Sequence, residues 1–282
     1  MSQPFRLNKE GLINRNKKIS FTFNGKKLFG YEGDTIASAL IANGIHLVGR
    51  SFKYHRPRGF FGAGVEEPNA KLQVEFNGHS EPNVNATEME LVEGLSATSQ
   101  NCWPSVNFDI GAINNFLKMF FPAGFYYKTF MWPKSFWYKI YEPFIRKAAG
   151  LGVASIEKDK ERYEHKFEYC DLLVTGSGPS GLASAYAAAK NGAKVILAED
   201  KPRFGGTLLT DDVSIDNLSG KDWAEKIITE LKSMPNVTVK NRSQVFGYYD
   251  HNMLVMSERV SDHLEKKSKL TPRQRLCYIR AK

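Results

Sequence analysis

Cysteine is scarce in this sequence of 282 residues. The three cysteines are Cys102, Cys170 and Cys277, and no two of them form a C-x-x-C pair. Zinc and iron–sulfur sites need closely spaced sets of thiolates, and a disulfide framework needs paired cysteines. We therefore predict free thiols, buried or incidental, and no metal site.

Long apolar stretches are also missing. The best candidate, "FLKMFFPAGFYYKTFMWP", is interrupted by Lys118, Pro122 and Lys128, so it does not predict a membrane-spanning helix. The N-terminus carries basic residues with no apolar run behind them, which is not the pattern of a signal peptide. With 42% hydrophobic and 24% charged residues, we expect a globular, cytoplasmic protein with no membrane partner.

Acidic residues are absent from residues 49–59, "GRSFKYHRPRG", which hold Arg50, Lys53, Arg56 and Arg58. The chain as a whole is moderately basic, with 39 lysines and arginines against 30 acidic residues. Arginine forks suit carboxylates and phosphates, so one hypothesis is contact with a partner domain or an anionic cofactor group. The alternative is simple solvated charge. His55 lies among these cations without a nearby carboxylate in the sequence, and we name no catalytic residue.

The first hundred residues have the pattern of a β-grasp domain. Residues 19–31 predict a hairpin around Asn24-Gly25, and Asp34 is expected to cap a helix over residues 36–42. Residues 71–78 predict a further strand. The fold class is thus α/β and α+β, with a ferredoxin-like β-grasp domain at residues 1–100 followed by a Rossmann-like dinucleotide-binding domain.

The segment between these domains, residues 101–165, is rich in aromatic residues and broken by four prolines at positions 104, 122, 133 and 143. The prolines exclude one long helix. Aromatic side chains carry large buried areas, so we expect an irregular linker that packs across domains or against another subunit.

The dinucleotide-binding domain is expected at residues 166–282. Strands at 172–175 and 194–198 flank an alanine-rich helix that ends at Asn191-Gly192, which makes a βαβ unit. A second helix at 222–234, a strand region at 237–250 and a hairpin return at 252–260 follow.

The glycine pattern G-x-G-x-x-G stands between the first strand and the helix, at Gly176, Gly178 and Gly181. The first glycine permits a tight turn, the second lets the backbone approach a pyrophosphate, and the third lets the helix lie close to the sheet. The N–H groups of the helix N-terminus favour phosphate.

An acidic residue follows at the expected distance. Glu199 ends the second strand, 23 residues after Gly176, and is placed to accept hydrogen bonds from an adenosine ribose, with Asp200 as the alternative. A carboxylate there favours NAD or FAD over NADP, and Gly205-Gly206 is typical of flavoproteins in which a further loop closes over the cofactor. A glycine turn without ligand is the opposing interpretation. The predicted cofactor-binding residues are Gly176, Ser177, Gly178, Pro179, Ser180, Gly181, Glu199, Asp200, Gly205, Gly206 and Thr207.

Several motifs together resemble the N-terminal part of the alpha subunit of heterotetrameric sarcosine oxidase: "LVGRSFKYHRPRG", "EEPNA", "SQNCWPS", "AGFYYKTFMWP" and "VTGSGPSGLASAYAAAKNGAKVILAED". The resemblance implies NAD in the dinucleotide domain, with FAD as the alternative, and a later folate-binding domain for tetrahydrofolate. It implies beta, gamma and delta subunits, with FAD in beta and FMN between alpha and beta. The implied reaction demethylates sarcosine to glycine and yields hydrogen peroxide, with formaldehyde or methylenetetrahydrofolate.

The sequence departs from that family in two ways. It ends at "PRQRLCYIRAK", before the dinucleotide domain would be complete, so we expect a fragment that is inactive alone. It also lacks the cluster cysteines of [2Fe-2S] relatives, because no cysteine precedes Cys102. Two alternatives stay open: a subunit of another amino-acid or opine dehydrogenase complex, and a basic RNA-binding or assembly module. We do not expect nucleic acid as the main partner.

Overall fold

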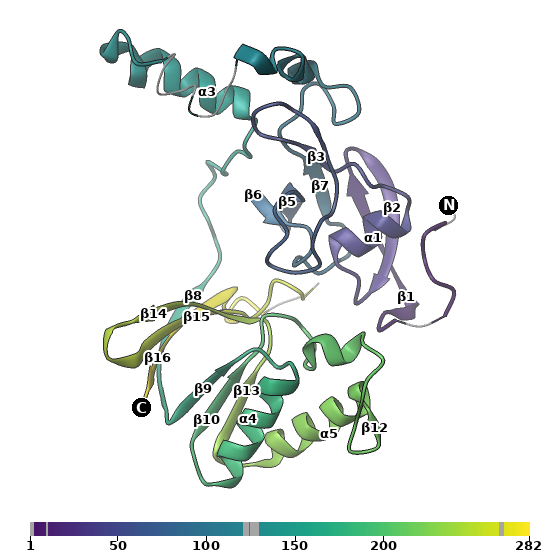
Figure 1. Ribbon diagram of the computed structural model, residues 1–282, viewed down its shortest axis with the longest axis vertical. Coiled ribbons are helices and arrows are strands. Elements are labelled where there is room, and N and C mark those ends of the chain that lie inside the picture. The colour runs from purple at the N-terminus through teal and green to yellow at the C-terminus, as the bar shows by residue number, and fades with distance from the viewer. Residues whose placement is uncertain (1–2, 10, 121–123, 125–129, 265–267) are drawn as a thin grey trace. The chain divides into compact units, whose positions relative to one another are not determined.

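A computed structural model describes residues 3–9, 11–120, 124, 130–264 and 268–282 of the chain. The chain forms two compact units, Met1–Asp159 and Lys160–Lys282, and each is described by itself (Figure 1). Among the described residues, no helix combines the length and the apolar composition needed to cross a bilayer.

The first unit contains a five-stranded mixed sheet in the order β2-β1-β7-β5-β6. Its strands are β1 (Asn14–Phe23), β2 (Lys26–Glu32), β5 (Lys71–Phe76), β6 (His79–Asn85) and β7 (Ser96–Ser99), and a separate ladder pairs β3 (Gly49–Arg50) with β4 (Pro57–Arg58). The predicted hairpin is confirmed: Asn24 and Gly25 have φ of 48° and 77°, the left-handed conformation that this turn needs. β1 pairs antiparallel with β2 and parallel with β7, the arrangement of a β-grasp fold.

Helix α1 (Ile36–Ala42) buries one face against this sheet. Its N-cap is Thr35, which exchanges side-chain hydrogen bonds with Ser38, so the prediction of Asp34 as the cap is wrong. Asp34 is instead buried and accepts a bidentate contact from Arg6 at 3.1 and 2.7 Å. Its carboxylate also accepts the Ser38 hydroxyl of α1 and the Tyr31 N–H, both at 2.8 Å, and so joins the N-terminal segment to the start of the helix.

The aromatic segment forms only short helical pieces within its described residues, as its prolines predicted. These are η1 (Ile110–Asn115), η2 (Lys118–Phe120), η3 (Lys134–Phe136), η4 (Trp137–Tyr141) and α3 (Glu142–Ala149). Residues 121–123 and 125–129 of the segment lie outside the described part of the chain. Phe116, Trp132 and Tyr138 are more than four-fifths exposed (84%, 83% and 82%). That the segment packs against another domain or subunit stays a prediction.

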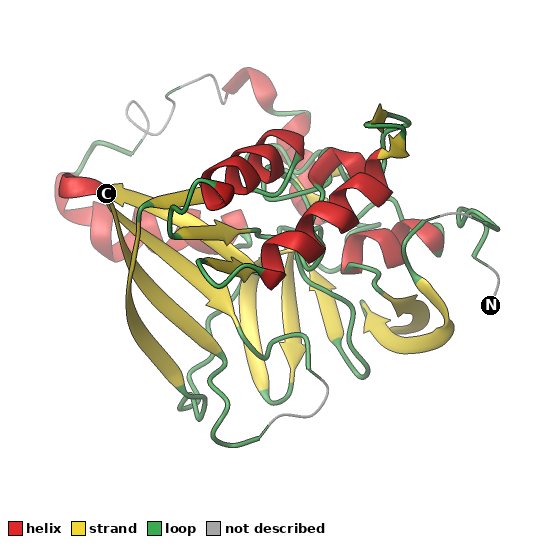
Figure 2. Cartoon of the chain, turned by 90° about the horizontal axis from the view of Figure 1, so that it is seen from below, coloured by secondary structure: helices red, strands yellow, loops and turns green. Residues whose placement is uncertain are grey.

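The second unit has three layers (Figures 1 and 2). Its middle layer is a parallel sheet in the order β13-β10-β9, with β9 (Leu172–Thr175), β10 (Val195–Ala198) and β13 (Val237–Lys240). Helices α4 (Pro179–Lys190) and α5 (Gly220–Ser233) cover one face. The third layer is a four-stranded sheet in the order β14-β15-β16-β8.

The alternating side chains of β10 join these layers. Val195 and Leu197 pack with the helices, whereas Ile196 and Ala198 pack with the four-stranded sheet. All four residues are buried, as expected for a central parallel strand covered on both faces. The predicted βαβ unit is confirmed, since β9 and β10 pair in parallel with Leu172 opposite Val195.

The four-stranded sheet includes two strands that the sequence patterns did not predict. Its members are β8 (Tyr163–Cys170), β14 (Ser243–Tyr249), β15 (Met253–Arg259) and β16 (Gln274–Ala281). β8 begins inside the segment expected to be linker, and β16 pairs with it in parallel. The predicted hairpin return at 252–260 is confirmed as β15, antiparallel to β14. Two further short strands, β11 (Ser214–Ile215) and β12 (Leu218–Ser219), form a hairpin before α5.

Candidate dinucleotide site

The glycine-rich turn connects β9 to α4. Gly176 has a φ of 88°, and its N–H donates to the carbonyl of Ala198 on β10 at 2.7 Å. A side chain is strained at this φ, so glycine is required by the turn itself. The turn therefore lies across the carboxyl ends of β9 and β10, where ligands of open α/β sheets bind.

The other two glycines of the motif differ in what surrounds them. A Cβ on Gly181 would lie 2.0 Å from the carbonyl oxygen of Gly176, so glycine there allows the helix to approach the strand. A Cβ on Gly178 would have no atom of the chain within 4 Å, and its φ of −65° suits any residue. Neither packing nor conformation within the described chain requires glycine at position 178.

The N-terminus of α4 faces this open space with unpaired N–H groups. Gly178 is the N-cap, Pro179 follows it, and no side chain caps the helix; its first turn contains no acidic residue. The N–H groups of Ser180 and Gly181 belong to the first turn and have no partner within the helix. Together with the helix dipole they make a site for an anion.

Glu199, at the end of β10, is buried and bound to the turn. One oxygen accepts hydrogen bonds from the Ser177 N–H at 2.8 Å and from the Ser177 hydroxyl, and the other accepts from the Lys201 N–H at 3.1 Å. Burial, and then a hydrogen bond with the neighbouring Asp200 carboxyl, raise the pKa of Glu199. The motif predicted the position of this carboxylate beside the turn but not its bonds to Ser177.

The second glycine pair packs directly on the first turn. Gly205 has a φ of 127° and donates its N–H to the carbonyl and hydroxyl oxygens of Ser177, at 3.1 and 3.0 Å. A Cβ on Gly206 would lie 2.9 Å from the Cα of Gly178. The structure thus brings residues 176–181, 199 and 205–207 together around one turn. Thr207 is exposed within η5 (Gly206–Leu209), and Asp200 is half-buried.

The thiols of this unit are free, and their burial disfavours the thiolate form. Cys170 and Cys277 are fully buried, and Cys102 of the first unit is partly exposed. Burial, together with Asp171, raises the pKa of Cys170 to about 11, and burial also raises the pKa of Cys277. A thiolate is the metal ligand and the nucleophile. Within the described residues no three His, Cys, Asp or Glu side chains gather as a metal site.

Two buried carboxylates of the first unit were not found from the sequence. Asp109 contacts the Nδ1 of His55 at 2.7 Å and is 54 positions away in the chain, so the carboxylate beside His55 comes from a distant part of the sequence. Glu67 accepts four backbone N–H groups: from Phe61 and Gly62 at 2.6 Å each, and from residues 69 and 70 at 2.7 and 3.2 Å. No local pattern marks either contact, because each depends on how a loop folds.

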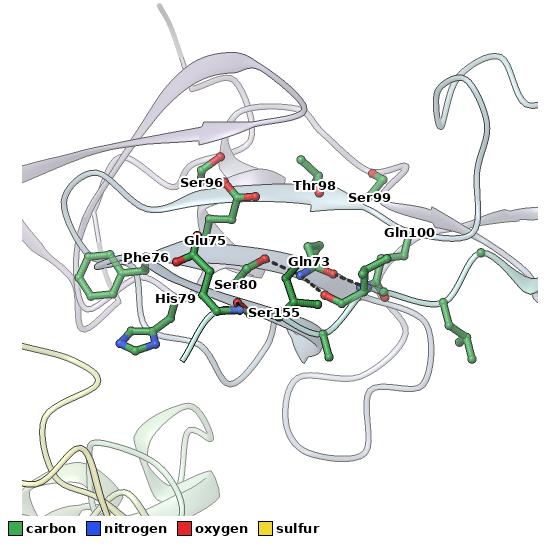
Figure 3. A pocket seen from close by; sticks show the side chains of 18 of the residues that line it. Gln73, Glu75, Phe76, His79, Ser80, Ser96, Thr98, Ser99, Gln100 and Ser155 are labelled. Atoms are coloured by element: carbon green, nitrogen blue, oxygen red, sulfur yellow. Dashed lines mark hydrogen bonds between the residues drawn. The ribbon is translucent and has the colours of Figure 1, made fainter. Parts of the chain in front are cut away.

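A groove of about 960 Å³ runs between β5, β7 and the chain segment 150–157 (Figure 3). Gln73 donates to the carbonyl of Val153 and accepts from its N–H, both at 3.0 Å. A Cβ on Gly152 would lie 2.1 Å from the side-chain amide of Gln100, so this segment passes very close to the sheet. Residues 150–157 therefore form one wall of the groove and are held against the sheet by these contacts.

Comparisons with known proteins agree with these two units. The family model described as a 2Fe-2S iron-sulfur cluster binding domain matches residues 16–102, and the one described as an FAD dependent oxidoreductase matches residues 171–253. Sarcosine oxidase subunit alpha of Rhizobium meliloti (strain 1021) is 54% identical over 275 residues, 98% of this chain. The chain is homologous to the alpha subunit of sarcosine oxidase. It spans 28% of that relative's length.

A more distant relative and a solved structure extend the comparison. Sarcosine oxidase subunit alpha of Corynebacterium sp. (strain U-96) is 32% identical over 291 residues, all of this chain and 25% of the relative. The crystal structure of L-proline dehydrogenase from P. horikoshii has a TM-score of 0.58 and 18% identity, and the match covers 99% of this chain and 41% of that one. This match supports the fold of the chain.

The residues present do not fit a [2Fe-2S] cluster in the first unit. Such a cluster needs four ligands, usually cysteine thiolates, and within residues 16–102 only Cys102 is a cysteine. In the loop between α1 and β5, the Glu67 carboxylate gathers backbone N–H groups instead. The unit keeps the ferredoxin-like shape without cluster ligands.

Proposed function

We propose that this chain is the dinucleotide-binding N-terminal part of the alpha subunit of a cytoplasmic sarcosine-oxidising flavoenzyme complex. The observation that supports it most directly is Gly178, a glycine with open space at its Cβ position, beside an uncapped helix N-terminus. The homology to sarcosine oxidase subunit alpha supplies the class of reaction, which this chain's own residues do not specify.

Each part of the turn has a role in holding the adenosine half of a dinucleotide. The N–H groups of Ser180 and Gly181 would bind the pyrophosphate, and Gly178 would let the backbone come close to it. Glu199 would accept hydrogen bonds from the ribose, with its carboxylate oriented by Ser177. Gly205-Gly206 and Thr207 would border the site from the other side. The bound dinucleotide supplies redox chemistry that no side chain of this turn can supply.

The choice between NAD and FAD is not made by these residues, because both share adenosine diphosphate. The match to an FAD dependent oxidoreductase model favours FAD, whereas the resemblance to the alpha subunit implies NAD. In the assembled enzyme we propose FAD in the beta subunit, FMN between the alpha and beta subunits, further gamma and delta subunits, and tetrahydrofolate as the acceptor of the one-carbon unit. We propose no residue of this chain as a ligand of these groups.

The decisive experiment is the release and identification of nucleotides from the purified complex, after co-expression of the alpha-subunit gene with those of its partner subunits. We expect NAD or FAD in proportion to alpha subunit, and hydrogen peroxide production that depends on sarcosine. Absence of any dinucleotide from wild-type protein refutes the binding site. If the complex contains dinucleotide but oxidises another amino acid or an opine instead of sarcosine, the binding site is supported and the proposed substrate is wrong.

A further inference from the structure

A second hollow, of about 390 Å³, lies in the first unit beside the basic loop. It is bordered by β3, the loop to β4, the start of β5 and the chain after β7. Its lining residues are Gly49, Arg50, Ser51, Phe52, Lys53, Tyr54, Arg58, Pro68, Asn69, Lys71, Gln100 and Asn101. Four of them are cations and none is acidic. This is a concave, positively charged surface of a size suited to a small ligand.

The four cations of residues 49–59 are not equivalent in the structure. Arg50 donates to the backbone carbonyls of Val106 at 2.8 Å, His55 at 3.2 Å and Asn107 at 3.4 Å. Arg50 therefore connects the basic loop to residues 106–107. A guanidinium already bonded to three carbonyls has few donors left for a ligand.

Lys53 and Arg56 are engaged with an aromatic ring. The Lys53 ammonium lies 5.0 Å and the Arg56 guanidinium 4.8 Å from the centre of the Tyr54 ring, which is cation–π distance. Arg56 also donates to the side chain of Asn115 at 2.8 Å and does not line the hollow. Of the four cations expected to contact a partner domain or an anionic cofactor group, Arg50 and Arg56 therefore have hydrogen-bond partners within this chain.

Arg58 and Lys71 are different. Both line the hollow and both are half-buried, yet within the described chain neither side chain has a hydrogen bond, an ion pair or an aromatic partner. They come from separate strands, β4 and β5. Glu67, close by in sequence, has its carboxylate committed to backbone N–H groups. Two partly desolvated cations without an anion are unfavourable, and an oxyanion between them would relieve that cost.

We propose that this hollow is a binding site for a small oxyanion ligand, a phosphate or carboxylate group held by the Arg58 guanidinium and the Lys71 ammonium. Its residues belong to the first unit, whereas the glycine turn belongs to the second. Asn69 and Asn101 border the same hollow and supply polar groups for the rest of the ligand. A hollow of about 390 Å³ suits a small molecule better than an acidic peptide, which would need an extended groove.

Titration calorimetry on the full 282-residue chain tests this, with inorganic phosphate and citrate as separate probes. We expect one of them to bind, and Arg58→Gln and Lys71→Gln each to weaken that binding at least about tenfold, as for loss of one charge-assisted hydrogen bond. Arg56→Gln is the matched control: it removes one positive charge from the same loop outside the hollow and is expected to change affinity less than about twofold. Thermal unfolding identifies any variant that fails to fold. If Arg58→Gln does not fold, Lys71→Gln tests the proposal instead, because Lys71 lies on a different strand.

Three results would overturn the proposal. One is the absence of binding by both probes to the wild-type chain. Another is equal affinity in the wild type and in folded Arg58→Gln and Lys71→Gln. The third is binding of an acidic peptide, such as a glutamate hexamer, when neither phosphate nor citrate binds, because that would make the surface a protein contact. Preference for phosphate or for citrate distinguishes a phosphorylated ligand from a carboxylate one.

Discussion

Alanine at Gly178 and alanine at Gly181 should have opposite consequences, although both replace a glycine of the same motif. At position 181 the added Cβ would lie 2.0 Å from the carbonyl oxygen of Gly176, a backbone atom that cannot rotate away. Normal van der Waals contact needs a separation more than about 1 Å larger, so α4 must move off β9. Overpacking of this kind costs about 1–3 kcal/mol, and we expect the second unit to unfold at least about 3 °C lower.

At position 178 the added methyl group meets no atom of the chain within 4 Å, and the φ of −65° is favourable for alanine. We therefore expect Gly178→Ala to unfold at the wild-type temperature or slightly above it. The methyl group would keep a pyrophosphate from the backbone N–H groups. Loss of one hydrogen bond to a charged group, worth about 1.5–3 kcal/mol, weakens dinucleotide binding by about ten- to a hundredfold.

The assay is a pair of measurements on each variant: thermal unfolding without ligand, and titration with NAD and with FAD. Each variant is the control for the other, because one changes stability and the other changes affinity. If Gly178→Ala binds dinucleotide as tightly as the wild type, the open space at its Cβ is not where the pyrophosphate lies. If Gly181→Ala unfolds at the wild-type temperature, the close approach of α4 to β9 does not explain that glycine.

Two further predictions concern buried carboxylates. Burial alone raises the pKa of Glu67, but the four backbone N–H donors outweigh it and lower that pKa. The carboxylate therefore stabilises the loop at neutral pH, and this contribution is lost as the pH falls below about 4.5 through the folded pKa. Glu67→Gln should accelerate amide exchange at residues 61, 62, 69 and 70 at neutral pH; unchanged exchange there refutes the role. The pKa of Glu199 is raised by burial, so dinucleotide affinity should fall with decreasing pH before an ordinary glutamate would titrate. Glu199→Gln should bind weakly with a flatter pH profile, and an equally steep profile in that variant would exclude Glu199 as the titrating group.

Local sequence patterns predicted the elements whose causes are local. The Asn24-Gly25 hairpin needs two adjacent residues at positive φ, and the βαβ unit needs two apolar strands, a glycine turn and an alanine-rich helix in succession. The cap of α1 was missed by one residue because Asp34 and Thr35 are both good caps. The tertiary structure shows that the Asp34 carboxylate instead binds Arg6, 28 positions away in the chain.

Strand partners and buried polar contacts required the tertiary structure. One face of β8, "YEHKFEYC", carries Glu164, Lys166 and Glu168, and both glutamates pair with cations of other strands. Arg275 on β16 contacts Glu164 at 3.1 Å, and Lys240 on β13 contacts Glu168 at 3.0 Å. The less exposed face of β8 is thus the charged one, whereas Tyr163, Phe167 and Tyr169 on the other face are exposed, the reverse of the usual strand pattern.

The sequence by itself determined the two kinds of unit, the absence of cluster thiolates before Cys102, and the glycine and acidic residues around one turn, because each follows from residue type and spacing. Only the tertiary structure decided how these residues are used. It joins Glu199 to Ser177, places Asp109 on His55, and separates Arg50 and Arg56, which have protein partners, from Arg58, which has none among the described residues. The physical reason is that the cost of a buried polar group depends on its partners, and those partners come from distant parts of the chain.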